Sequence, residues 1–77
     1  MPMETLNEPY TQKFTYTATG LIEYQGWARP GIATSASNWR ICKYTYDGSG
    51  NQTDIKWASG TKDFDKEYDE RTSYTYS

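Results

Sequence analysis

Hydrophobic and polar residues alternate along most of this chain, which is typical of strands in a half-buried sheet. In residues 14–19 the even positions are aromatic or apolar, the odd positions are threonine, and Gly20 then breaks the pattern. In residues 21–28 one face would carry Ile22, Tyr24, Gly26 and Ala28, and the other Glu23, Gln25 and Trp27. The alternation therefore predicts two strands separated by a turn.

The strongest local signal is a pair of strand-like runs on either side of a glycine-rich turn. The runs are residues 39–46 and 53–57, both rich in aromatic and β-branched residues, with Asp47-Gly-Ser-Gly-Asn51 between them. Glycines suit turn positions with positive φ, so the pattern predicts a β-hairpin with a loop of about four or five residues. If Tyr46 pairs with Gln52, one side of the hairpin would form the core and would carry Trp39, Ile41, Ile55 and Trp57.

The first strand of this hairpin has apolar residues on both of its faces. Trp39 and Ile41 occupy odd positions, whereas Cys42, Tyr44 and Tyr46 occupy even positions. Either both faces are covered, or a bulge near residues 42–43 shifts the register. If another subunit provides the second cover, Tyr44 and Tyr46 become interface residues.

The remaining segments contain turn, helix and strand signals. Arg29-Pro30-Gly31 predicts a type II turn, with proline and glycine at the positions that this turn favours. Thr61 is suited to cap a short helix near residues 62–71, whose first turn is acidic. Residues 72–76 alternate again and predict a last strand.

These elements predict one small β domain at residues 12–77, preceded by a flexible N-terminal arm at residues 1–11 that contains two prolines. The expected fold class is all-β: a small antiparallel sandwich or partly open barrel of about five strands with one short helix. A chain of 77 residues has only a thin core. Eight of its aromatic residues are tyrosines, which can keep one edge in water.

The composition argues against several classes of site. The chain has no histidine and a single cysteine, Cys42, so it offers no Ser-His or Cys-His couple, no zinc-type spacing and no internal disulfide. We therefore predict no enzyme activity, no catalytic residue, no cofactor and no metal. A net charge of −2 argues against nucleic acid as a partner. Short apolar runs and the absence of signal-peptide features predict a soluble protein without a membrane segment.

Two acidic segments could be considered as metal sites, but their sequences do not support that interpretation. Asp47, Ser49 and Asn51 imitate the first ligands of a calcium loop, but Gln52 and Ala58 stand where that loop needs glycine and glutamate. The acidic residues of the segment 63–70 are interleaved with lysine and read as a solvated helix face.

Large rings outside the expected core are candidates for contact with a partner. Trp27 lies on the Glu23 and Gln25 face, just before the Arg29 turn, and tryptophan and arginine are enriched at interface hot spots. The candidate interface residues are Tyr24, Trp27, Arg29, Tyr44 and Tyr46.

Several motifs in the last two-thirds of the chain occur in a distinctive order. They are Trp27-Ala-Arg-Pro-Gly31, Trp39-Arg-Ile41, Thr45-Tyr-Asp-Gly-x-Gly-Asn51, Asp63-Phe-Asp65 and Tyr74-Thr-Tyr-Ser77. In this order residues 24–77 resemble a group of small proteins from tailed bacteriophages and prophages. The resemblance implies a non-enzymatic virion or virion-associated protein, and it supplies no functional residue.

On this basis we predict a bacteriophage structural protein, made in the bacterial host cytoplasm and located in the virion. It would be a minor capsid, decoration or tail or connector component that contacts other virion proteins and forms a homo-oligomer. One alternative is a carbohydrate- or receptor-binding module of a phage tail or fibre, in which Trp27 and Tyr24 stack on a surface glycan. Another is a small regulator of a host protein.

Overall fold

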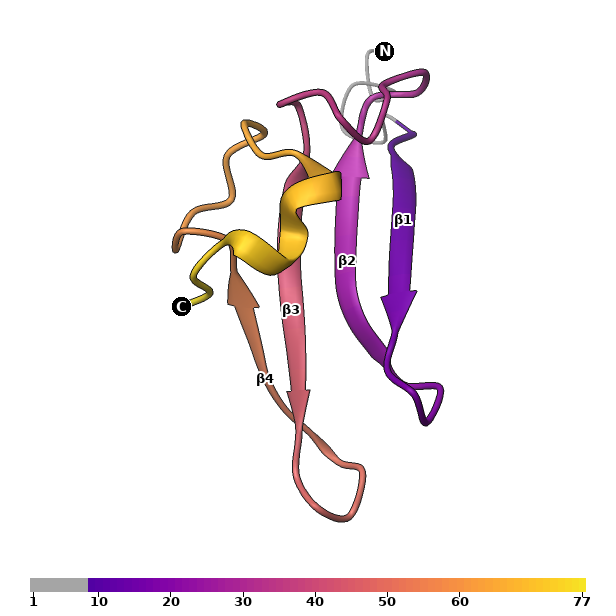
Figure 1. Cartoon of the computed structure of the whole chain (residues 1–77), viewed down its shortest axis with the longest axis vertical. Helices are drawn as coiled ribbons and strands as arrows, with labels where there is room; N and C mark the ends of the chain where they lie inside the picture. Colours follow the sequence, from indigo (N-terminus) through magenta and orange to yellow (C-terminus); the bar gives the residue numbers. More distant parts are fainter. Residues whose placement is uncertain (1–8) are drawn as a thin grey trace, which may run out of the picture.

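The computed structural model describes residues 9–77 and contains an open antiparallel sheet with one short 3-10 helix on one face (Figure 1). The strands are β1 (Thr11–Tyr16), β2 (Ile22–Ala28), β3 (Arg40–Tyr46) and β4 (Gln52–Trp57), and they lie in the order β1-β2-β3-β4. The helix, η2 (Tyr68–Ser73), crosses the sheet over β2 and β3. The predicted all-β class is confirmed, with four strands in the sheet.

The turns between strands follow the local signals in the sequence. Ile32 N donates to Arg29 O at 3.3 Å and Gly31 has a φ of +89°, which is the predicted type II turn. In the hairpin, Asp47 N donates to Asn51 O at 2.9 Å across the predicted five-residue loop.

The first strand begins and ends earlier than the alternation predicted. β1 covers Thr11–Tyr16, whereas Thr17 belongs to the turn. The backbone N–H of Thr17 donates to Leu21 O at 2.7 Å, and its hydroxyl accepts from Leu21 N at 3.1 Å. The backbone N–H and the hydroxyl of Thr17 both bond to Leu21 across the turn. The turn therefore begins at Thr17, two residues before the alternating threonine pattern ends.

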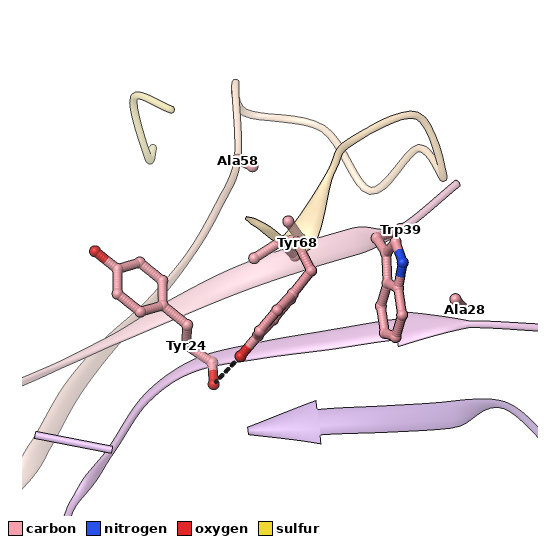
Figure 2. Packing of buried hydrophobic residues seen from close by; sticks show 6 residues of the cluster. Tyr24, Ala28, Trp39, Ala58 and Tyr68 are labelled. Atoms are coloured by element: carbon pink, nitrogen blue, oxygen red, sulfur yellow. Dashed lines mark hydrogen bonds between the residues drawn. The ribbon is translucent and has the colours of Figure 1, made fainter. Parts of the chain in front are cut away.

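The core lies between the sheet and η2. It contains Tyr24, Ala28, Trp39, Ile41, Ala58 and Tyr68. Figure 2 shows the Tyr68 ring between Tyr24 and Trp39, with its hydroxyl directed at the backbone of Tyr24. The Tyr68 hydroxyl also lies 2.7 Å from Thr15 Oγ1, and the rings of Tyr68 and Trp39 are 5.6 Å apart. One tyrosine therefore joins η2 to β1, β2 and the start of β3.

The predicted hairpin core was half wrong, because one extra residue changes the register. Tyr46 does pair with Gln52, but Thr53 is left unpaired, so Thr45 faces Asp54 and Tyr44 faces Ile55. A bulge thus lies near residues 45–46 and not near residues 42–43. Trp39 and Ile41 are buried as predicted, whereas Ile55 and Trp57 lie on the opposite face and Ile55 is 48% exposed.

The C-terminal segment also differs from the prediction. The expected helix at residues 62–71 is absent before Tyr68, because Lys66 exchanges two backbone hydrogen bonds of 2.9 Å with Trp39 and is held in an extended conformation. The helix that does form is the short 3-10 helix η2. The expected last strand at residues 72–76 is reduced to an isolated bridge between Ala58 and Tyr76, since η2 continues to Ser73.

The predicted N-terminal arm falls mainly on residues 1–8, which lie outside the described residues; its last residue, Thr11, begins β1. Within residues 9–77, no helix has the length and apolar character needed to cross a membrane.

Candidate functional site: the open face of the sheet

The sheet face opposite η2 is rich in aromatic and amide side chains. Strand pairing places nine residues on it: Gln12 and Phe14 of β1, Gln25 and Trp27 of β2, Arg40, Cys42 and Tyr44 of β3, and Ile55 and Trp57 of β4. We call this set the open face, because no strand or helix among residues 9–77 covers it. The predicted placement of Gln25 and Trp27 away from Tyr24 is confirmed.

Charge is distributed between the two faces in an unusual way. Arg40 is the one ionised residue among the nine of the open face. The other charged strand residues that the register places lie on the η2 side, and they are Lys13, Lys43, Asp54 and Lys56. Antiparallel sheets usually turn their polar face to water. Among these paired residues, the uncovered face has fewer charges. Two charged residues stand outside the comparison: Glu23 of β2 has no partner in the register, and Lys62 lies 5.7 Å from the ring centroid of Trp57.

Several exposed hydrophobic side chains lie on the same face or at its end. Phe14 is 39% exposed and Ile55 is 48% exposed, at opposite edges of the sheet. Tyr10 and Phe64 stack on each other with ring centroids 5.4 Å apart, and Phe64 lies against Arg40 at one end of the face. Single exposed apolar residues are ordinary, so Phe14 and Ile55 indicate a contact surface only together with the rings of β2 and β3 that lie between them on this face.

Arg40 is held by three aromatic rings at that end. Its guanidinium carbon lies 4.9 Å from the ring centroid of Trp27, 5.0 Å from that of Phe64 and 5.5 Å from that of Trp57. The two tryptophan rings are themselves 5.7 Å apart. A cation over aromatic faces is attracted by their quadrupoles. The side chain thus packs against three rings and keeps its positive charge.

A row of hydrogen bonds crosses the middle of the open face. The Tyr44 hydroxyl donates to Gln25 Oε1, and Gln25 Nε2 donates to Gln12 Oε1 at 2.8 Å. The row links β3, β2 and β1, and Gln25 is already buried in the single chain. Polar groups that satisfy one another can be covered by a partner at low cost.

Cys42 and Tyr44 are both held in their neutral forms. Burial raises the pKa of the Cys42 thiol. Burial, followed by the neighbouring Cys42 and Tyr46 side chains, raises the pKa of Tyr44 to about 12. At neutral pH the thiol is therefore protonated, and the phenol can act as the hydrogen-bond donor that the row requires.

The five candidate interface residues are not all brought together. Trp27 and Tyr44 lie on the open face, whereas Tyr24 is 7% exposed and packs in the core on the other side. The Tyr46 hydroxyl donates to Ile22 O at 2.7 Å within the chain. Arg29 lines a shallow hollow of about 230 Å³ at the end of the sheet, together with Tyr10, Ile32, Asn38 and Phe64.

The sequence prediction placed Gln25 beside Trp27 but missed Phe14, Arg40, Ile55 and Trp57 as members of this face. Phe14 could have been found by aligning the alternation of the first two strands. Ile55 and Trp57 could not, because the bulge at Thr53 that moves them has no distinctive residue.

The Asp47 carboxylate accepts hydrogen bonds from residues of its own hairpin loop. Asp47 Oδ1 accepts from Ser49 N at 2.9 Å and from Asn51 N at 3.0 Å, and Oδ2 accepts from Asn51 Nδ2 at 3.3 Å. These bonds, led by the one from the Asn51 backbone, lower the pKa of Asp47. Among residues 9–77, no group of three or more metal-binding side chains converges.

Comparisons of the chain with protein-family models, with curated proteins and with solved structures found no match.

Proposed function

We propose that this chain is a non-enzymatic structural protein of a bacteriophage virion, where it acts through protein–protein contacts as a minor capsid, decoration or tail or connector component. The contact role rests on one observation, the open face of nine residues with a single ionised side chain. The phage assignment rests on the resemblance of residues 24–77 to small proteins of tailed phages.

The chemistry of the open face suits a protein partner. Tryptophan, tyrosine and arginine are the residue types that most often dominate binding energy. Trp27, Trp57 and Arg40 contact one another here, and Tyr44 lies on the same face. The cores of interfaces are depleted in charge. Gln25 and Tyr44 already satisfy each other, so a partner need not replace their hydrogen bond.

The test is the protein content of particles. Virions of the phage or prophage that encodes this chain are purified by density-gradient centrifugation and analysed by quantitative mass spectrometry. We expect the chain to co-purify in a fixed ratio to the major capsid or tail protein. Absence from virions and from assembly intermediates, with expression early in infection, would contradict the proposal and favour a regulator of a host protein.

A glycan-binding module is the rival supported by one feature, the pair Trp27 and Trp57 beside the amides of Gln12 and Gln25. Two observations weigh against it: Arg40 already lies over both tryptophan rings, and Tyr24 packs on the other face. Saturable binding in a glycan screen that Trp27→Ala abolishes would favour the rival.

A further inference from the structure

We propose that the open face is covered by the open face of a second copy of this chain, which forms a two-sheet sandwich between the two copies. This inference rests on the contact role proposed above and names the partner. It does not depend on the location of the protein in a virion.

The first argument concerns layers. A sheet with apolar residues on both faces needs a cover on both, and sheets pack face to face about 10 Å apart with nearly aligned strands. η2 covers one face of this sheet at Gly26 and Trp39. On the other face Phe14 and Ile55 remain 39% and 48% exposed. A second flat sheet is a cover that reaches both edges, from β1 to β4.

The second argument concerns area. Strands of about six residues at 4.8 Å spacing give the four-stranded face a flat outline of roughly 20 Å by 19 Å, or about 400 Å² before side-chain relief is added. A specific interface needs roughly 600 Å² from each partner. The broad side of the molecule measures 45 × 27 Å and lies parallel to the sheet. Side-chain relief and the stacked Tyr10 and Phe64 rings at one end extend the flat outline of the face towards the required area.

The third argument concerns charge. A surface can meet its own copy only if it does not repel itself. Arg40 is the one ionised residue among the nine of the open face, and Lys62 lies near the same end, 5.7 Å from the ring centroid of Trp57. Arg40 lies near one end of the face, opposite Trp27. A two-fold axis through the middle of the face and across the strands places the two Arg40 side chains at opposite ends of the interface. Closed two-fold dimers are the commonest symmetric assemblies.

The experiment compares neighbouring substitutions that change the charge equally but point to opposite faces. Ile55→Asp and Phe14→Asp add a negative charge on the open face, and Lys56→Gln and Lys13→Gln remove a positive charge one residue away on the η2 side. Each variant lowers the net charge by one. Sedimentation velocity over a range of concentrations measures the dimer dissociation constant, and circular dichroism checks the fold.

We expect a wild-type dimer, because the two open faces bury each other. The Asp variants should raise the dissociation constant about 100-fold or more, since a buried, unpaired carboxylate is costly. The two Gln variants should dimerise as wild type does. A wild-type protein that is monomeric at every concentration overturns the inference, as does a dimer that all four variants retain, since that dimer would use another surface.

A second measurement needs no variant. Trp27 and Trp57 lie on the open face, whereas Trp39 is buried in the core. Dilution of a dimer should therefore shift the tryptophan emission to the red along the same curve as the sedimentation data. A concentration-independent emission overturns the inference. A dimer that is absent from virions would contradict the proposed function and leave this inference standing.

Discussion

Gly26 is the residue on which the packing of η2 depends. A Cβ at this position would lie 2.6 Å from Cδ1 of Tyr68, 2.8 Å from Cε1 of Tyr68 and 3.0 Å from Cε3 of Trp39. Real Cβ atoms do not approach so closely, so either the tyrosine ring or the strand would have to move. The alternation placed Gly26 on the same face as Tyr24 and Ala28, and in the structure the Tyr68 ring packs against it.

Gly26→Ala is therefore expected to destabilise the fold by about 1–3 kcal/mol, the usual cost of overpacking a core. Urea unfolding followed by circular dichroism measures the change. Gly48→Ala is the matched control, because a Cβ there meets nothing within 4 Å. Equal stabilities of the two variants would show that the ring and the strand do not touch as described.

The contribution of Tyr44 to the stability of the fold depends on pH in the alkaline range. Its pKa rises from an ordinary 10.0 to about 12 in the folded chain, mainly through burial, so folding favours the neutral phenol. This contribution to stability is fully present below pH 10 and is lost as the pH rises from 10 towards 12.

Tyr44→Phe should thus be less stable than wild type near neutral pH by about 1 kcal/mol, because Gln25 Oε1 loses its donor. The difference should shrink as the pH rises above 10, since only the wild type then has to keep a phenol neutral. Urea unfolding at a series of pH values measures both. A difference that stays constant through this range would mean that the phenol ionises alike in the folded and unfolded chains.

At the scale of elements, the accuracy of the sequence prediction depended on how local each signal was. Pro30 and Gly31 specify their turn by themselves, and Asp47 closes its own loop, so both turns were predicted correctly. The helix depended on a distant contact: Lys66 pairs with Trp39, 27 positions earlier in the sequence, and no local pattern announces that pairing.

The candidate site was predicted in part for the same reason. Alternation within one strand placed Trp27 opposite Tyr24 correctly. The face of Ile55 depended on a single unpaired residue, Thr53, which reverses every later side chain of β4 relative to β3. A threonine in a strand carries no sign that it will be the unpaired one.

The Asp47 loop offers a test of hairpin stability against pH. Hydrogen bonds to the carboxylate lower its pKa below the ordinary 3.8, so the charged form stabilises the turn above that pH, and the benefit is lost as the pH falls through the folded pKa. Asp47→Ala should lower the thermal unfolding midpoint at neutral pH, and the gap to wild type should close in acid. Asp54→Ala, in the adjoining strand β4, is the control. A gap that persists at low pH would assign the effect to side-chain packing.

At the scale of the whole molecule, the two sheet faces are stabilised by different means. The η2 side buries Tyr24, Trp39 and Tyr68 within one chain. The open face exposes rings whose polar neighbours are already satisfied internally. A domain of this size has a small margin of stability, so covering the second face would add stability as well as specificity, and assembly and folding would be coupled.

The C-terminal segment couples several elements of the fold within a single chain. Tyr76 packs against Tyr24 with centroids 5.6 Å apart and donates its hydroxyl to Arg71 O at 2.7 Å, while Ser77 exchanges backbone hydrogen bonds with Trp57. These contacts join the end of the chain to β2, β4 and η2, so a lesion there should be felt across the sheet.

Tyr76→Ala is therefore expected to destabilise the whole domain by about 2–4 kcal/mol, because a half-buried ring and its hydrogen bond are lost together. Tyr16→Ala removes an equal ring that is 57% exposed and should stay within about 0.5 kcal/mol of wild type. Urea unfolding followed by both circular dichroism and tryptophan fluorescence should give one shared midpoint for each protein, as two-state unfolding requires. If Tyr76→Ala separated the two midpoints, η2 and the C-terminus would unfold independently of the sheet, and the molecule would not be one cooperative unit.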